Sequence, residues 1–317
     1  MKRTLILVLV SLVLLFSGCT RSKGEPKDPY RIAVITMMQG GEFWGSLKNG
    51  ARSARSATDA VLEFFAPVNE SDYEGQISAV QRAIDQGFDA IVLSPSHYTR
   101  LEDVVAKARL AQIQVVLANN SLKSVHPDYQ ITADYKKMGK AMAEHAFGYF
   151  DKDEMINALI IGSMPNTTSM QQLVESLVTA FAQKSNATIS NVSYSFTDAG
   201  RAMEISRNAL DNDSTINLIF ALEEYTSHGV ANALNGSDSV RFIAFGTTQY
   251  EIQLLEQGVI DALVVVNSFN MGYRSILAAV DLLNGKKPVE KLVDFDLVTK
   301  ESMFSEEHQH LLFQTFQ

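Results

Sequence analysis

The chain of 317 residues contains a single cysteine, Cys19, and a single tryptophan, Trp44. One cysteine excludes a disulfide within the chain and leaves the thiol without a partner for dithiol redox chemistry. Acidic residues outnumber basic ones, 36 to 27, and the formal net charge is -9. Because such a surface repels a phosphate backbone and no basic cluster offsets it, we expect no binding to nucleic acid.

The common catalytic and nucleotide-binding motifs are also missing from the sequence. No expected strand is followed by a G-x-S-x-G elbow, a Walker loop or a G-x-G-x-x-G turn, since Gly40-Gly41 lacks the third glycine and the downstream acid. The six histidines are scattered along the chain. The pair Asp211 and Asp213 lacks the glycine and distal glutamate of a calcium loop. We therefore expect neither an enzyme, nor a metal site, nor a cofactor.

The apolar run at the start of the chain is too short to cross a membrane, which takes about 20 residues. It covers residues 4–16, follows Lys2 and Arg3, and leads to the sequence LFSGC at 15–19. That ending resembles the lipobox of bacterial lipoproteins, whose cysteine is lipidated and becomes the new N-terminus, although Phe16 replaces a small aliphatic residue. We predict a signal peptide over 1–18, lipidation of Cys19 and a flexible polar tether over 19–29. The alternative for a lone cysteine is a small buried apolar residue.

Strand and helix patterns alternate after the tether. The first unit is an apolar, β-branched run at 31–36, a turn at Gln39-Gly40-Gly41 and a helix from Phe43 onward. Further strands are expected at 61–65, 89–94, 113–118, 129–132, 157–162, 188–196, 216–221, 240–245, 260–266 and 292–299, with helices between them and a polar tail at the end. Such alternation predicts parallel strands and right-handed crossovers. Because the strand-turn-helix unit starts again at 157, we predict two similar doubly wound α/β lobes.

Phe43 and Trp44 lie at the expected boundary between the first strand and the first helix. In open α/β sheets, ligands bind at the carboxyl ends of strands. The aromatic pair therefore either faces a ligand or packs the start of the helix against the core.

Five segments carry a resemblance to a known family. They are FWGSLKNGA at 43–51, ITAD at 131–134, FALEE at 220–224, FNMGY at 269–273 and LVTK at 297–300. In this order and spacing, the chain from Tyr30 to Glu301 resembles the type I periplasmic binding proteins, in the sugar-binding branch that includes the ribose- and galactose-binding proteins. The resemblance implies two Rossmann-like lobes joined by a three-strand hinge, with the ligand in the cleft between them.

Mapped onto this chain, the resemblance implies a first lobe of residues 30–133 and 267–294 and a second lobe of 134–266 and 295–317, with Asp134 at the hinge. Ligand-binding positions are then expected at Phe43, Trp44, Asn119, Asn120, Gln171, Thr197, Glu223, Thr247 and Asn267. The two aromatics would stack on the apolar face of a sugar, and the polar side chains would take its hydroxyls. Thr197, Thr247 and Asn267 are placed by position alone.

Several of these positions depart from the family. Asn119-Asn120 replaces a charged pair such as Asp-Arg, Gln171 replaces an arginine, and Glu223 replaces an asparagine. Gly246 replaces an aspartate of the family pattern, and Val266 replaces a glutamine. Since a hydrogen bond to a charged group contributes about 1.5–3 kcal/mol, we expect a different ligand or weak ribose binding.

A structural explanation also exists for the positions Asn119-Asn120, Glu223 and Gln171. Asn119-Asn120 would suit a turn, because asparagine tolerates the left-handed conformation. Glu223 would favour the positive end of a helix dipole, and Gln171 would suit a solvated helix face.

Two functions are compatible with the resemblance. The first is an extracytoplasmic lipoprotein that delivers a small polar solute, most simply a sugar, to an ABC transporter. The second is a lipoprotein that reports its ligand to a membrane histidine kinase or chemoreceptor. Both use lobe closure in a monomer anchored at the membrane by lipid, and the neighbouring genes would separate them.

Overall fold

The computed structural model describes residues 28–236 and 239–313. The predicted signal peptide over 1–18, the lipidation site Cys19 and the tether up to residue 27 lie outside the described residues.

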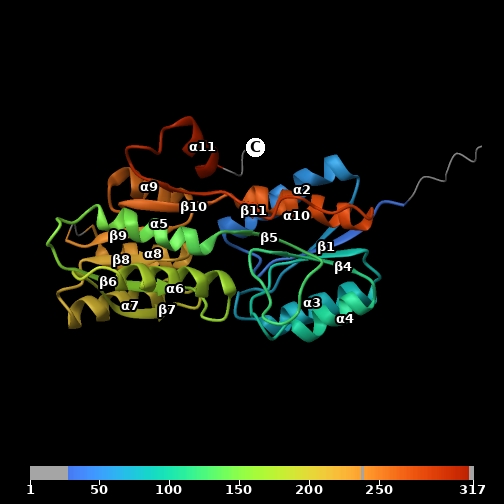
Figure 1. The fold of residues 1–317 in the computed structure, drawn as a ribbon, viewed down its shortest axis with the longest axis horizontal. Helices are drawn as coiled ribbons and strands as arrows, with labels where there is room; N and C mark the ends of the chain where they lie inside the picture. Colours follow the sequence, from blue (N-terminus) through green and yellow to red (C-terminus); the bar gives the residue numbers. More distant parts are fainter. Residues whose placement is uncertain (1–27, 237–238, 314–317) are drawn as a thin grey trace, which may run out of the picture.

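Two six-stranded sheets lie side by side along the long axis of the molecule (Figure 1). The first has the order β11-β5-β4-β3-β1-β2, and the second has the order β12-β10-β9-β8-β6-β7. The first contains β1 (Arg31–Ile35), β2 (Val61–Phe65), β3 (Ala90–Leu93), β4 (Gln114–Ala118), β5 (Tyr129–Ala133) and β11 (Leu292–Val293). The second contains β6 (Ile156–Gly162), β7 (Ala187–Tyr194), β8 (Leu218–Ala221), β9 (Arg241–Phe245), β10 (Ala262–Val266) and β12 (Phe295–Val298). The same winding occurs twice, which confirms the prediction of two doubly wound α/β lobes.

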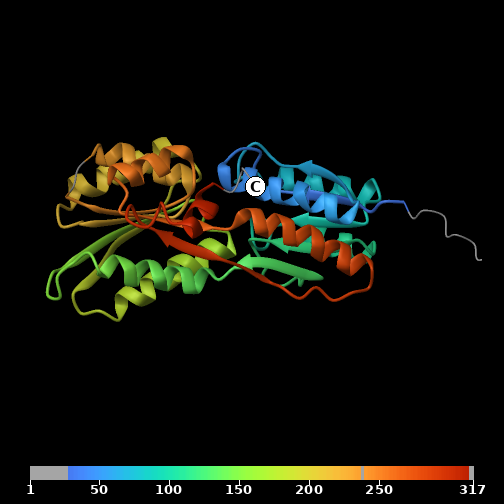
Figure 2. The same ribbon diagram turned by 90° about the horizontal axis from the view of Figure 1, so that it is seen from above.

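Helices cover both faces of each sheet, as Figure 1 shows for the first sheet and Figure 2 for the second. They are α2 (Glu42–Thr58), α3 (Tyr73–Asp85), α4 (Glu102–Leu110), α5 (Tyr135–Phe147), α6 (Thr168–Ala182), α7 (Ala199–Asn212), α8 (Glu224–Leu234), α9 (Gln249–Gln257), α10 (Ser268–Leu283) and α11 (Glu306–Leu312). In the first lobe α2 packs on α10 and α3 on α4; in the second α5 packs on α6 and α7 on α8. Among the described helices, none is both long and apolar enough to span a lipid bilayer.

The apolar strand β1 is buried on both faces, as expected for a parallel strand between helical layers. Ile32 and Val34 join the core beneath α2 and α10, whereas Ala33 and Ile35 join the core beneath α3 and α4. This alternation explains why the strand reads as an unbroken apolar run rather than as alternating polar and apolar residues.

Helices α2 and α10 approach each other through two glycines. A Cβ atom on Gly50 would lie 1.9 Å from the carbonyl oxygen of Phe269, and one on Gly272 would lie 1.9 Å from that of Leu47. Only residues without a side chain fit this contact, and it fixes the direction of α2 and hence of Phe43 and Trp44.

The chain passes between the two sheets three times: from β5 into α5, from β10 into α10, and from β11 to β12. Asp134 stands at the first crossing and caps α5, where its carboxylate accepts a hydrogen bond from the amide of Lys137 at 2.9 Å. At the other two crossings, the amide of Asn267 donates to the carbonyl of Asp294 at 3.0 Å. The second and third crossings therefore lie next to each other.

The end of the chain differs from the sequence prediction in two ways. The single strand expected at 292–299 is two short strands in different sheets, and β12 runs antiparallel to β10. The expected polar tail contains α11, which Ser305 caps and which buries Leu312 in the second-lobe core. The sequence did not predict this helix because the few apolar residues of the tail show no helical spacing.

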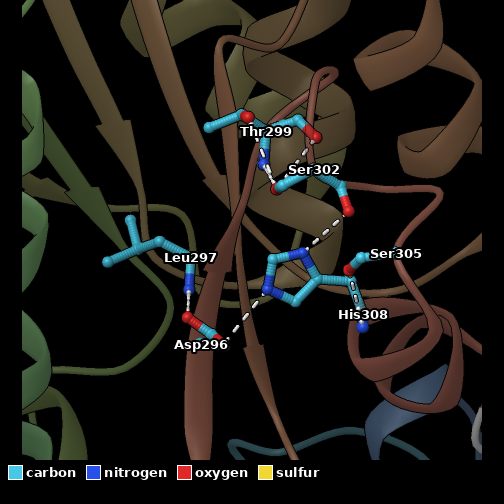
Figure 3. Close-up of polar contacts among 6 residues, drawn as sticks. All are labelled: Asp296, Leu297, Thr299, Ser302, Ser305 and His308. Atoms are coloured by element: carbon cyan, nitrogen blue, oxygen red, sulfur yellow. Dashed lines mark hydrogen bonds and ion pairs between the residues drawn. The ribbon is translucent and has the colours of Figure 1, made fainter.

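His308 holds α11 to the strand before it (Figure 3). Its ring nitrogens lie 3.1 Å from a carboxylate oxygen of Asp296 and 2.9 Å from the carbonyl oxygen of Ser302. The ring thus ties α11 to β12, the strand that follows the third crossing.

Candidate functional site

A cavity of about 80 Å³ lies between the two lobes and has room for several water molecules. The first lobe contributes Met37, Met38, Gly41, Phe43, Trp44, Glu70, Asn119, Asn120 and Ser268 to its lining. The second contributes Tyr135, Ser163, Thr167, Ser169, Met170, Leu173, Leu222, Glu223, Glu224, Tyr225, Phe245, Gly246, Thr247, Val264, Val265 and Val266. Many of these residues follow the carboxyl ends of strands, as expected for open α/β sheets.

The aromatic pair at the start of α2 forms one wall of the cavity. The ring of Phe43 lies edge-on to Trp44, with centroids 4.8 Å apart, and 6.5 Å from Phe245 of the opposite lobe. Trp44 is buried, and its indole nitrogen donates to Glu70 Oε1 at 2.8 Å. Both residues therefore pack against the core and also line the cavity, and their contact with a ligand stays a prediction.

Glu70 connects the two lobes although its side chain is only 5% exposed. Besides the indole N–H of Trp44, its carboxylate accepts the hydroxyl of Thr197 at 3.0 Å. Burial raises the pKa of Glu70, and the two hydrogen bonds act in the opposite direction. This residue was not among the predicted site positions. It lies in the loop after β2, and its position beyond the carboxyl end of a strand is the one signal for it in the sequence.

The pair Asn119-Asn120 closes a turn and also lines the cavity. Asn119 has a φ of 67°, in the left-handed region, and accepts a hydrogen bond from the hydroxyl of Tyr135. Asn120 donates to the carbonyl of Pro95 at 3.1 Å and accepts from the amide of Ser169 at 3.1 Å. Since Tyr135 and Ser169 belong to the second lobe, both asparagines contribute to contacts between the lobes.

Two carboxylates of the second lobe lie at the start of α8. Glu223 caps the helix by accepting the amides of Tyr225 at 2.9 Å and Thr226 at 3.1 Å, and it also lines the cavity. Burial, and next the negative charge of Glu70, raises the pKa of Glu223 to about 8.

Glu224 reaches across to the first lobe. Its Oε2 accepts the amide of Glu42 at 2.8 Å, at the N-terminus of α2, where Gly41 offers no side-chain cap. Burial raises the pKa of Glu224, against the effect of the amide hydrogen bonds from Glu42 and Phe43. One lobe thus caps a helix of the other.

Another carboxylate lies directly behind the cavity wall. Gly246 lines the cavity with a φ of 150°, and a Cβ atom placed on it would lie 2.2 Å from Glu251 Oε2. Glu251 is fully buried, and its Oε1 has no hydrogen-bond partner among the described residues. Burial raises the pKa of Glu251 well above its ordinary value. Because Gly246 has no side chain, it leaves space for this carboxylate from α9.

The structure brings six of the nine expected ligand positions to the cavity wall: Phe43, Trp44, Asn119, Asn120, Glu223 and Thr247. The other three lie elsewhere. Gln171 is exposed on α6, where its neighbour Met170 lines the cavity instead. Thr197 reaches Glu70 rather than the cavity, and Asn267 caps α10 by accepting the amide of Asn270 at 2.9 Å. Neither the wall nor any other described part of the chain contains three or more His, Cys, Asp or Glu side chains placed to hold a metal ion.

Comparison with known proteins identifies relatives that span nearly the whole chain. The ribose import binding protein RbsB of Bacillus subtilis (strain 168) is 21% identical over 306 residues, which cover 94% of this chain and 98% of that protein. The D-allose-binding periplasmic protein of Escherichia coli (strain K12) is 21% identical over 278 residues, covering 84% and 89%.

A solved structure is similar in both fold and length. The ABC transporter solute binding protein from Agrobacterium vitis, with bound D-fucose, superposes with a TM-score of 0.83 and 25% identity, covering 89% of this chain and 100% of that one. The family model described as a periplasmic binding protein domain matches residues 32–287. Because this match includes strands of both sheets, the chain belongs to the periplasmic binding protein domain family, as the sequence predicted, and is a binding protein rather than an enzyme.

Proposed function

We propose that this protein is an extracytoplasmic lipoprotein that captures a small polyhydroxylated ligand, a sugar or a close relative of one, and delivers it to an ABC transporter. The observation that carries this proposal is the cavity between the lobes, which joins an aromatic wall to a set of amide, hydroxyl and carboxylate groups. Sugars need both kinds of surface, because their ring faces are apolar and their rims donate and accept hydrogen bonds.

Lobe closure is the expected binding motion. The lobes contact each other through Glu70 and Thr197, through Glu42 and Glu224, and through Asn120 and Ser169. A ligand that touches both walls of the cavity favours this closed arrangement over an open one, since only the closed form offers all of its contacts at once.

The relatives support a monosaccharide-sized ligand. Their names specify ribose and D-allose, and the solved structure contains D-fucose. The wall of this cavity differs from the pattern expected for a ribose site at Asn119-Asn120, Glu223 and Gly246. We therefore expect ribose itself to bind more weakly than micromolar.

The membrane anchor is the lipid on Cys19, which lies outside the described residues. Replacing Cys19 by alanine is expected to move the protein from the membrane fraction to the soluble extracytoplasmic fraction. An unchanged membrane association of C19A would count against the anchor.

A sensor that presents its ligand state to a membrane kinase would use the same closure. Neighbouring genes for a permease and an ATPase support import, whereas genes for a histidine kinase and a response regulator support sensing.

The function is tested by calorimetric titration of the purified mature chain with a panel of pentoses, hexoses and amino sugars. We expect at least one member to bind with a stoichiometry of one, and Trp44→Phe to weaken that binding. If no member of the panel binds to folded protein, the proposed function is wrong.

A further inference from the structure

Carboxylates from both lobes meet at the cavity. Glu70 comes from the loop after β2, and Glu223 and Glu224 come from the start of α8. The charge of Glu70 acts on both of the others, so the three groups are electrostatically close. Behind Gly246, the buried Glu251 adds a fourth carboxylate, and the charges of Glu223 and Glu224 act on it as well.

No cationic side chain among the described residues pairs with these groups. The cavity wall, as far as the structure describes it, contains no lysine, arginine or histidine. None of the ion pairs found between described residues involves Glu70, Glu223 or Glu224. Their hydrogen-bond donors are an indole, hydroxyls and backbone amides, all of which are neutral. The N-termini of α2 and α8 supply only partial positive charge to Glu224 and Glu223.

We propose that the ligand carries a protonated amino group beside its hydroxyls, as an amino sugar does, and that Glu70 and Glu223 bind this ammonium. The inference rests on the proposed function, because it concerns the same cavity. An ammonium offers N–H donors to carboxylate oxygens and supplies the positive charge that the wall lacks. It is also attracted to aromatic rings, and Phe43, Trp44 and Phe245 line the same cavity.

The wall favours an organic cation over a metal ion. No group of ligating side chains within the described residues has the arrangement of a metal site. Methionines 37, 38 and 170, together with the aromatic rings, instead make much of the wall apolar. A metal ion requires oxygen or nitrogen atoms on most sides, whereas an amino-substituted ring presents its charge at one edge and carbon elsewhere.

The competing explanation is that the carboxyls are protonated and donate hydrogen bonds to a neutral sugar, since burial favours the neutral form of a carboxyl group. The two explanations differ in proton balance. A bound ammonium restores the charged carboxylates, so its binding releases protons to the buffer. A neutral sugar bound by neutral carboxyls releases none.

The test compares D-glucosamine and D-galactosamine with D-glucose, D-galactose and N-acetyl-D-glucosamine by calorimetry at mildly acidic pH, in buffers of different ionisation enthalpy. We expect an amino sugar to bind about tenfold or more tightly than both its neutral parent and its N-acetyl form, with net proton release. In E70Q and E223Q this preference should fall about tenfold, whereas E204Q, at an exposed residue on α7, should keep it.

Two results would overturn the inference, and they bear differently on the proposed function. If a neutral sugar binds as tightly as its amino counterpart, or if binding releases no protons, the ammonium proposal is wrong while the sugar-binding function stands. If neither neutral nor amino sugars bind, both are wrong. Because the comparison between ligands uses the unaltered protein, it holds even if a glutamine variant fails to fold.

Discussion

The indole nitrogen of Trp44 lies 2.8 Å from Glu70 Oε1, and the other oxygen of that carboxylate accepts the hydroxyl of Thr197. The only tryptophan of the chain is thereby connected, through one buried side chain, to the opposite lobe. The orientation of the aromatic wall and the contact between the lobes depend on the same residue.

Replacing Glu70 by alanine tests this connection. The buried indole N–H of Trp44 would lose its acceptor, and an unsatisfied buried donor costs about 1–3 kcal/mol. We expect E70A to lower the free energy of unfolding, measured by urea titration, by that amount. E70Q, whose amide oxygen still accepts from the indole, should lose clearly less; equal losses in the two variants would show that the hydrogen bond is not what matters.

Stability should depend on pH through Glu223. The pKa of this carboxyl is about 8 in the folded protein, against an ordinary value of 4.5, and burial is the main cause. Between these values the folded protein binds a proton that the unfolded chain has released, so stability falls as pH rises from about 5 to about 8. The loss is on the order of a few kcal/mol.

E223Q removes that contribution, together with the effect of the Glu223 charge on the pKa of Glu251. His145 and His228, whose pKa values burial lowers, act in the opposite direction in the lower part of the window, but they are present in both proteins. As the pH rises from about 5 to about 8, the free energy of unfolding of the wild type should therefore fall steadily relative to that of E223Q. A difference that does not change with pH would contradict the assignment.

The contact between α2 and α10 predicts opposite effects for three glycines. G50A and G272A would each place a methyl group against a backbone carbonyl, and we expect each to destabilise the protein by about 3 kcal/mol or more. A Cβ on Gly45, which lies in the same helix as Gly50, meets nothing within 4 Å. G45A should therefore stabilise the helix by about 0.5–1 kcal/mol. Thermal unfolding separates G45A from the other two variants. Similar melting temperatures for G45A and G50A would refute the close contact.

The positions of Asn120 and Gln171 predict different effects on binding. Asn120 lines the cavity and accepts the amide of Ser169, so N120A should weaken ligand binding about tenfold or more. Gln171 is exposed on α6, so Q171A should bind as the wild type does. Calorimetry on both variants, with circular dichroism to confirm folding, checks this pair. A loss of affinity in Q171A would restore the expectation drawn from the family pattern.

The sequence predicted the fold well because its signals are local. Strands such as Val61–Phe65 and helices such as α6 show their periodicity within a few residues, and turns such as Gln39-Gly40-Gly41 have a chemical signature. The end of the chain was harder. Residues 292–298 form strands in two different sheets, and the chain passes from one sheet to the other at Asp294. No local pattern reveals with which strand each of these segments pairs.

The site was predicted less completely, because it depends on tertiary contacts. Phe43 and Trp44 could be placed from the strand-helix boundary alone. For Glu70 the sequence offers only its position after a strand, because the residue lies in a loop whose burial depends on the tertiary contacts with Thr197 and Trp44. For Gln171, the family pattern suggested a ligand contact, but the rotation of α6 points Met170 into the cavity.

Trp44 provides the most direct measurement of the central claim that the ligand binds between the lobes. Since it is the only tryptophan, the intrinsic fluorescence of the protein reports on this one wall of the cavity. For any sugar or amino sugar that binds by calorimetry, we predict a saturable change in tryptophan emission with the same dissociation constant. Calorimetric binding that leaves the emission unchanged would contradict a ligand site at this wall.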